Sequence, residues 1–223
     1  MQPHFVRDYR RAVRILKRRH SLDDAMSLAV GGQYELIGAA QVALLRDCGL
    51  RDDAAVLDVG CGSGRTAFAL RTISALRYHG IDVVPDLIAY AREKVGRPDW
   101  RFSVVNGLSI PERSEWADVV MMFSVLTHLT SCEGLRYLQD AARVTKPGGQ
   151  IIATFLDRAC EAQVAMAGSW IRQIFSRIRG RTVKNVLLSP VELRAWADSL
   201  RLDTQFFGPE RIGQSYCVFT KPA

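Results

Sequence analysis

The sequence predicts an α/β fold in which helices flank a mostly parallel sheet of seven strands, closed by a C-terminal antiparallel hairpin. Three observations lead to this prediction. From residue 55 onward, short apolar runs alternate with segments of helical spacing. Most of these runs are apolar on both faces, which is typical of parallel strands covered by helices. After residue 188 the alternation gives way to one helix and two consecutive strands.

The alternating part supplies five strands and three helices. The strand-like runs are rich in β-branched and aromatic residues and cover residues 55–60, 77–83, 100–106, 117–123 and 149–155. Helical spacing is found at residues 65–73, 85–95 and 131–145. The run "TKPGG" (145–149) carries the Pro and Gly that end the last of these helices. Strands that alternate with helices in this way predict right-handed crossovers between parallel strands.

The C-terminal part completes the sheet. Residues 189–200 begin with Ser and Pro, which favour an N-cap and a first helical turn. Two strand-like runs, 203–208 and 215–222, are joined by a short polar turn and predict an antiparallel hairpin. Segment 157–188 fits neither pattern, and we interpret it as an insertion.

The composition indicates a cytoplasmic protein. The 223 residues are 48% hydrophobic, which is enough for one well-buried domain. No run approaches the roughly 18 apolar residues of a membrane span, and no apolar signal region follows the basic N-terminus. The five cysteines form no CxxC pair, which argues against a disulfide framework and a structural zinc site. No metal-ligand cluster is visible in the sequence, and the oligomeric state stays open.

The net charge of +7 is concentrated in two segments. Residues 1–20 hold seven Lys or Arg and one acid, and residues 170–185 hold five and none, so the rest of the chain is mildly acidic. Both segments also place apolar residues on one helical face. One interpretation is that these faces pack on the domain. The other is that the charges recruit an anionic partner, such as an acidic small molecule, a membrane surface or nucleic acid.

A cluster of glycines follows the first strand, in "AVLDVGCGSGRTAFAL" (55–70). A glycine-rich turn between a strand and a helix is a ligand-binding arrangement, because the backbone can approach a ligand closely there. The spacing of Gly60, Gly62 and Gly64 is one residue shorter than the dinucleotide fingerprint, and no Lys-Ser/Thr follows for a P-loop. The turn is therefore not expected to hold a pyrophosphate.

Four motifs in order resemble those of class I S-adenosylmethionine-dependent methyltransferases, a Rossmann-like family. They are "VLDVGCGSGRTA", "GIDVVPDLIAYAREK", "ADVVMMFSVLTHL" and "ARVTKPGGQIIATF", and the likeness covers roughly residues 30–156. The resemblance implies S-adenosylmethionine as cofactor and Asp82, at the end of the second strand, as the acid that holds the ribose hydroxyls. The sequence departs from the family pattern after the third strand, where Asn106 stands in place of the usual acid near the adenine amino group. An Asn oxygen can still accept from an amine.

The resemblance implies a cofactor site of several short segments. Its residues are Asp58, Gly60, Cys61, Gly62, Gly64, Asp82, Val83, Asn106, Gly107, Leu108 and Ser124. Asp58 either caps the loop backbone or contacts the methionine end of the cofactor. Cys61 is interpreted as a small filler, since the family uses the backbone there. Gly31 and Gly32 either end a helix or belong to a segment that folds over the cofactor.

The acceptor side is predicted from position at the carboxyl edge of the sheet. His128 follows the fourth strand, where it either lines the pocket or acts as general base for a hydroxyl acceptor. Further candidates for the substrate side are Tyr34, Thr127, Asp157 and Trp170. We expect residues 1–30 to form a basic helical arm that covers the cofactor, and residues 31–223 to form one methyltransferase domain with the insertion 157–188 as substrate lid.

The predicted function is methyl transfer to a small-molecule or a glycan- or lipid-linked acceptor, with O-methylation favoured because His128 supplies a base. The protein is expected in the cytoplasm, with the option of a peripheral position at an anionic membrane. Nucleic acid is less favoured, because the "FSVLTH" run (123–128) lacks the Pro-Pro-Tyr/Phe signature of amino-methylating enzymes. Two alternatives stay open: an RNA or protein methyltransferase that docks through its basic segments, and a non-catalytic partner protein that binds S-adenosylmethionine.

Overall fold

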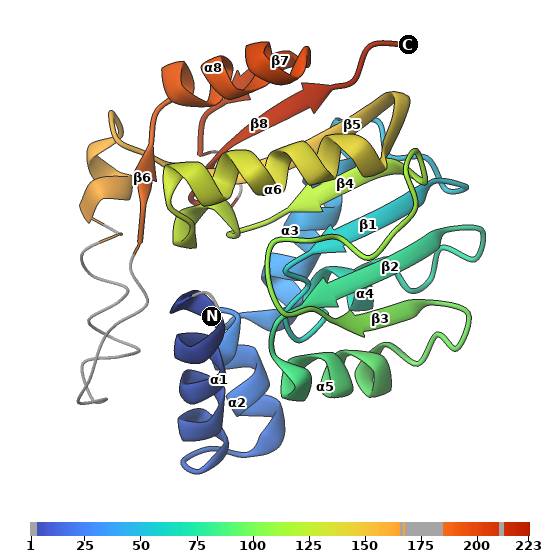
Figure 1. The fold of residues 1–223 in the computed structure, drawn as a ribbon. Coiled ribbons are helices and arrows are strands. Elements are labelled where there is room, and N and C mark those ends of the chain that lie inside the picture. Colours follow the sequence, from blue (N-terminus) through green and yellow to red (C-terminus); the bar gives the residue numbers. More distant parts are fainter. Residues whose placement is uncertain (1–3, 166, 168–184, 210–211) are drawn as a thin grey trace. The chain divides into compact units, whose positions relative to one another are not determined.

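A computed structural model describes residues 4–165, 167, 185–209 and 212–223. The chain divides into two compact units, Met1–Gly107 and Leu108–Ala223, each with its own strands (Figure 1). This division does not follow the domain boundary expected near residue 30, and that boundary stays a prediction. Trp170 and nearly all of the second basic segment lie outside the described residues.

The first unit is a three-stranded parallel sheet with five helices among its described residues. Its strands have the order β3-β2-β1, with Asp58 of β1 beside Gly80 of β2, and Gly80 beside Phe102 of β3. The elements are α1 (His4–Lys17), α2 (Leu22–Ala29), α3 (Tyr34–Asp47), β1 (Ala55–Val59), α4 (Arg65–Leu70), β2 (Arg77–Asp82), α5 (Pro85–Val95) and β3 (Arg101–Val104). Every residue of β1 is buried, as its two-sided apolar pattern predicts.

Local signals in the sequence account for α5. Pro85 occupies the first turn, where its missing N–H costs nothing, and Gly96 ends the helix in the left-handed conformation with a φ of 65°. Its bounds therefore agree with the predicted range 85–95.

Gly80 of β2 makes room for two neighbouring side chains. A Cβ at this position would lie 3.0 Å from the Cys61 sulfur and 3.0 Å from the Tyr78 ring.

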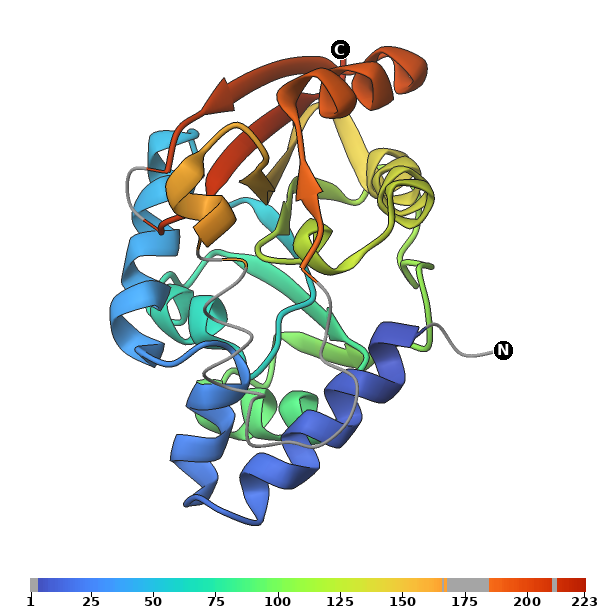
Figure 2. The same ribbon diagram turned by 90° about the vertical axis from the view of Figure 1, so that its left-hand side faces the viewer.

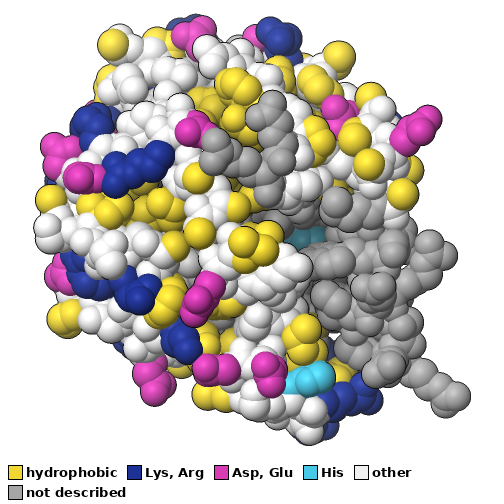
Figure 3. All heavy atoms as spheres, turned by 180° about the vertical axis from the view of Figure 1, so that it is seen from behind, with side chains coloured by type: hydrophobic (Ala, Val, Ile, Leu, Met, Phe, Trp, Pro, Cys, Tyr) yellow, Lys and Arg dark blue, Asp and Glu magenta, His cyan; other side chains and the backbone are white. Residues whose placement is uncertain are grey.

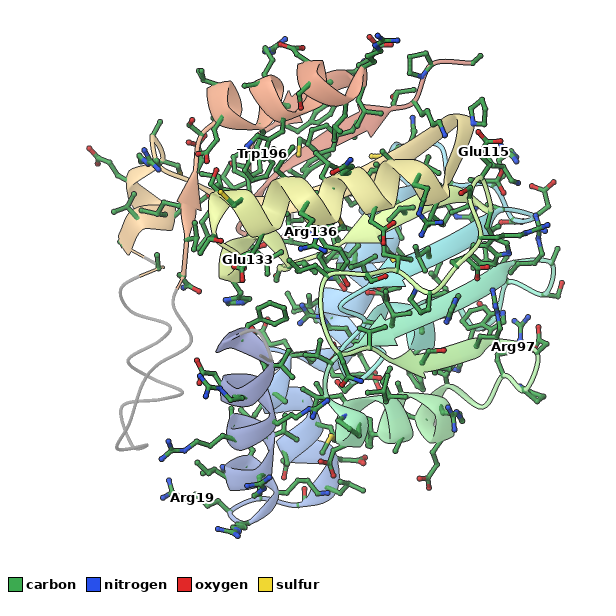
Figure 4. The ribbon with its side chains drawn as sticks, viewed as in Figure 1. Arg19, Arg97, Glu115, Glu133, Arg136 and Trp196 are labelled. Atoms are coloured by element: carbon green, nitrogen blue, oxygen red, sulfur yellow. The ribbon has the colours of Figure 1, made fainter. Side chains whose placement is uncertain are left out.

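The apolar face of α1 is buried within the first unit. Val6, Ala12 and Val13 are at most 5% exposed, and α1 and α2 lie side by side (Figure 2). The packing interpretation is thus confirmed for this segment. The arginines at positions 7, 11 and 14 remain exposed on the other face of the helix, and Arg19 points away from it (Figure 4).

The second unit carries the rest of the sheet in the order β4-β5-β8-β7, with β6 paired to β5. β4 and β5 are parallel, whereas β8 is antiparallel to both β5 and β7, which confirms the C-terminal hairpin. The elements are β4 (Ala117–Met122), η1 (Leu126–His128), α6 (Ser131–Val144), β5 (Thr145–Asp157), β6 (Leu187–Leu188), α8 (Pro190–Leu200), β7 (Asp203–Phe207) and β8 (Ser215–Thr220). With the two-residue β6, the described strands number eight rather than the predicted seven.

β5 begins four residues earlier than predicted, at Thr145 instead of residue 149. The reason is pairing with other segments: Thr145 pairs with Ala117 of β4, and further along Gly148 N–H donates to the Lys221 carbonyl while Lys221 N–H donates to the Gly149 carbonyl. This pairing extends the sheet through a segment that was expected to be a turn. On α6, Gly134 makes room for Trp196 of α8, which points toward that helix (Figure 4).

The surface carries both signs of charge. On the face shown in Figure 3, lysine and arginine side chains are interspersed with aspartate and glutamate among the described residues. Within the described residues no single helix has the length and apolar character to cross a membrane, although α2 and α3, bent by 41° at their junction, pass that test as a pair.

Candidate functional site

A glycine loop follows β1 in the first unit. Gly60, Gly62 and Gly64 have φ angles of 72°, 56° and 80°, in the left-handed region that favours glycine. Space is restricted as well: a Cβ on Gly62 would lie 2.6 Å from Val30 Cγ1, and a Cβ on Gly64 would lie 2.8 Å from Ala91 Cβ. Both the backbone conformation and the packing of neighbouring helices therefore require glycine at positions 62 and 64.

Asp82 holds this loop from the end of β2. Its Oδ2 accepts from the Gly62 N–H at 3.0 Å, and its Oδ1 accepts from the Val84 N–H at 2.8 Å. Burial raises the pKa of this carboxyl to about 6, although the backbone N–H donors lower it. Each carboxylate oxygen can accept a further hydrogen bond, so Asp82 orders the loop and keeps capacity for the hydroxyl groups of a ligand.

Asp58 has a different partner from the loop backbone. The Tyr78 hydroxyl donates to its Oδ2 at 2.6 Å, and the Tyr78 ring stacks on Trp100 with centroids 4.7 Å apart. Burial raises the pKa of Asp58 to about 7, and the Tyr78 hydrogen bond partly offsets this rise. Sequence reasoning missed Tyr78; the available signal was a tyrosine in a two-sided apolar strand next to β1, because a buried hydroxyl needs an acceptor.

The segment between α2 and α3 packs on the glycine loop. The Tyr34 hydroxyl donates to the Ser63 carbonyl at 2.8 Å, the Ser63 hydroxyl donates to the Met26 carbonyl at 3.0 Å, and Arg65 donates to the Val30 carbonyl at 2.7 Å. Gly31 and Gly32 follow the end of α2 with positive φ. They therefore end a helix, as one of the two interpretations has it, and Met26 and Val30 at that end contact the loop. That the segment folds over the cofactor stays a prediction. Tyr34, expected on the substrate side, lies against the loop.

Helix α1 reaches the ends of β2 and β3. Arg10 donates through Nε to the Val83 carbonyl at 2.9 Å and through Nη2 to Asn106 Oδ1 at 3.1 Å. Lys17 pairs with Asp86 at the start of α5. Burial raises the pKa of Tyr9 and the nearby Asp82 carboxylate raises it further, so α1 also covers the end of β2. Sequence spacing gave no signal for Arg10.

The remaining predicted cofactor residues differ in exposure. Cys61 is buried, and burial raises the pKa of its thiol, which favours the neutral form that packs as a small side chain. Asn106 is exposed, and Gly107 and Leu108 are half-buried. Leu108 already belongs to the second unit. The structure thus brings the glycine loop, Asp82, Val83 and Asn106 together within the first unit.

A hydroxyl and amide network follows β4 in the second unit. Ser124 has a φ of 58°, which is uncommon for a residue with a Cβ. Its N–H donates to Thr154 Oγ1 at 2.7 Å, and the hydroxyls of Ser124 and Thr154 both donate to Gln214 Oε1, at 3.2 and 2.7 Å. The Thr127 hydroxyl donates to the Ser124 carbonyl at 2.9 Å. Gln214 was missed because only the antiparallel return of β8 brings it to this loop.

The other acceptor-side candidates lie in the same unit. His128 ends the short helix η1 and is half-buried. Asp157 ends β5, where its Oδ1 accepts from the Ala159 N–H at 2.9 Å and its own N–H donates to Gln163 Oε1 at 2.6 Å. Trp170 lies outside the described residues.

Comparisons with known proteins agree with this site. A family model described as a methyltransferase domain matches residues 56–149, which include the glycine loop, Asp82, Asn106 and η1. A magnesium protoporphyrin IX methyltransferase from Synechocystis, solved with bound S-adenosylhomocysteine, superposes with a TM-score of 0.67 at 17% identity, over 97% of this chain and 98% of that one. Residues 56–149 thus match a methyltransferase domain, and the chain shares the fold of S-adenosylmethionine-dependent methyltransferases. The predicted Rossmann-like fold is thereby confirmed, and a methyltransferase domain agrees with the expectation of S-adenosylmethionine as cofactor.

Two relatives indicate the range of acceptors among similar methyltransferases. A ubiquinone biosynthesis O-methyltransferase from Xanthomonas oryzae is 28% identical over 158 residues, which are 68% of this chain. The match spans 64% of that relative's length. A demethylmenaquinone methyltransferase from Tropheryma whipplei is 38% identical over 102 residues, 44% of this chain and 39% of the relative.

The residues of the first unit fit S-adenosylmethionine. A buried carboxylate with remaining acceptor capacity suits a ribose diol, and a left-handed glycine backbone beside it leaves no side chain in the way. Within the described residues, the Asn106 NH₂ group has no hydrogen-bond partner, so it is available to a polar ring edge. Nothing in this set conflicts with that cofactor.

Proposed function

We propose that this methyltransferase transfers the methyl group of S-adenosylmethionine to an oxygen of a small, lipid-soluble acceptor of the quinone class. The observation that carries the proposal is the similarity to two relatives named as methyltransferases of quinone biosynthesis, one of them an O-methyltransferase. The proposal includes acceptors that are linked to a glycan or a lipid. Such an acceptor has the same two features as a lipid-soluble ring, namely a hydroxyl group and an apolar part next to it.

In this proposal the residues that the family resemblance identifies hold the cofactor. Asp82 accepts hydrogen bonds from the ribose hydroxyls. The backbone of the glycine loop lies along the cofactor, at Gly60, Cys61, Gly62 and Gly64. Asp58 lies at the start of this loop and either caps its backbone or contacts the methionine end of the cofactor. Val83, Asn106, Gly107 and Leu108 surround the adenine, and Ser124 completes the site. The cofactor supplies an activated methyl group, so the protein has to align the acceptor oxygen and exclude water.

The proposed general base is His128. It follows β4, and ligands of open α/β sheets bind at the carboxyl ends of the strands. Its ring nitrogen takes the proton that the acceptor hydroxyl loses as the new carbon–oxygen bond forms. Thr127, Tyr34, Asp157 and Trp170 are proposed to contact the acceptor, with residues 157–188 as its lid.

We further propose that the enzyme works in the cytoplasm and meets its acceptor at an anionic membrane. The support is the exposed row Arg7, Arg11 and Arg14 on a helix whose apolar face is already buried in its own unit. Attachment would then depend on charge rather than on insertion, and salt would weaken it.

Transfer of labelled methyl groups into a fractionated cell extract tests the proposal. We expect label in the small-molecule or lipid fraction, and loss of that label with His128→Ala at unchanged affinity for S-adenosylhomocysteine. Label in RNA or protein instead would refute the proposed acceptor class and make α1 a docking surface. A protein that binds cofactor but labels no fraction would be the non-catalytic partner considered above.

A further inference from the structure

Arg10 of α1 joins two loops by hydrogen bonds. Val83 follows β2 and Asn106 follows β3, and these strands are neighbours, with Asp82 beside Val104. From α1, the Arg10 guanidinium donates to the Val83 carbonyl at 2.9 Å and to the Asn106 side chain at 3.1 Å. Arg19, beyond the same helix, points away from the unit instead (Figure 4).

The chemistry of arginine fixes which way the Asn106 amide faces. A guanidinium has donors and no acceptor, so the atom that faces Arg10 has to be the amide oxygen. The NH₂ group of Asn106 is then the part of the side chain that faces away from Arg10. In the described part of the chain this NH₂ group donates to nothing, and the residue is exposed.

We propose that Arg10 is a cofactor-positioning residue. It pins the Asn106 oxygen, so that the Asn106 NH₂ group is presented to the adenine ring of S-adenosylmethionine and donates to a ring nitrogen. The adenine amino group, itself a donor, is then not recognised by this side chain. The inference rests on the proposed assignment of Val83 and Asn106 to the adenine end of the site. It also explains why an asparagine serves here, since a carboxylate has no donor to present.

The first test measures S-adenosylhomocysteine binding by calorimetry. The variant Arg10→Met should bind about tenfold more weakly, in line with a charge-assisted hydrogen bond. The matched control is Arg14→Met, which removes the same charge from the exposed side of the same helix and should change the affinity by less than about twofold. In an Asn106→Ala background, Arg10→Met should cost no more than about threefold, because its main partner is already gone.

The second test uses an S-adenosylhomocysteine analogue that lacks only the adenine amino group. The wild type should bind it within about threefold of the parent compound, since Asn106 donates to a ring nitrogen that both ligands share. Asn106→Asp should instead prefer the parent by about tenfold, because its second carboxylate oxygen accepts from the amino group. If Arg10 only stabilises the fold and does not orient the Asn106 amide, wild type and Asn106→Asp should not differ in their preference for the parent ligand over the analogue.

The outcomes separate the inference from its premise. If Asn106→Ala leaves the affinity of a binding-competent protein unchanged, the assignment of Asn106 to the adenine end is wrong. If Asn106→Ala weakens binding but Arg10→Met acts equally in both backgrounds, only the role of Arg10 is overturned. A wild type that prefers the amino group strongly, with the preference lost in Asn106→Ala, would overturn the proposed orientation of the amide.

Discussion

The buried carboxyl of Asp58 should make the stability of the protein depend on pH, and Asp58→Asn should remove that dependence. Burial raises the pKa of this group from 3.8 to about 7, and the residue is 3% exposed. A raised pKa means that the folded state favours the protonated form. The stability it contributes is complete below pH 4 and is lost as the pH rises through 7. An asparagine keeps an acceptor for the Tyr78 hydroxyl but never ionises.

The size of the effect follows from the two pKa values. Each pKa unit is worth about 1.36 kcal/mol, so the wild type should lose about 2 to 3 kcal/mol relative to Asp58→Asn between pH 5 and pH 8.5. Urea unfolding without cofactor at the two pH values measures this difference. Asp82 also ionises in this pH range, but it does so in both proteins and therefore does not contribute to the difference between them. Asp53→Asn is the matched control, because it makes the same substitution at a side chain that is 72% exposed.

One result would refute this reasoning. If the stability difference between Asp58→Asn and wild type is the same at both pH values, Asp58 ionises as freely as an exposed carboxylate. Tyr78→Phe gives an independent check, because the Tyr78 hydrogen bond lowers the pKa of Asp58. Its loss should raise the folded pKa further, so that the decline of stability continues to a higher pH and the cost at pH 8.5 is larger.

Further predictions concern the cofactor loop and the base. Asp82→Ala should weaken S-adenosylhomocysteine binding by about 1–3 kcal/mol, measured by calorimetry. Ribose donors favour the ionised form of Asp82, so wild-type affinity should rise with pH through about 6, and a flat profile between pH 5 and pH 7.5 would contradict the assignment. Gly62→Ala, which meets Val30, should destabilise the fold by about 2 kcal/mol or more. Gly148 also has a positive φ, but a Cβ there would meet open space. Gly148→Ala should therefore lower the free energy of unfolding by only about 1 kcal/mol, measured in urea. His128→Ala should lower turnover at least about a hundredfold with cofactor affinity unchanged; a parallel loss of both would make His128 structural.

Elements with local signals were predictable from the sequence, and elements shaped by distant contacts were not. The bounds of α5 follow from Pro85 and Gly96, and α6 begins after Thr130, which forms a capping box with Glu133. The start of β5 was misplaced because Thr145 pairs with Ala117 of β4, and Gly148 and Gly149 pair with Lys221, more than 70 residues away. A helix-stop pattern cannot distinguish a turn from a strand that a C-terminal segment will complete.

The same distinction holds for the candidate site. Asp82 and the three glycines lie at fixed places after strands, so pattern and family resemblance together identify them. Arg10 donates to partners 73 and 96 residues away, and Tyr78 donates to a partner 20 residues away. Periodicity carries no information about such pairs. Gln214 belongs to the same class, because its contacts with Ser124 and Thr154 span 90 and 60 residues.

The segments that precede β1 pack on the residues that we propose to hold the cofactor. Val30 limits what can stand at Gly62, and Tyr34 holds the loop through Ser63. Arg10 reaches the far side of the same unit at Asn106. Every described segment of the proposed cofactor site in the first unit is therefore in contact with residues 4–34. Because the loop and its cover stabilise one another, a change in the cover should alter cofactor affinity even where the glycine loop is intact.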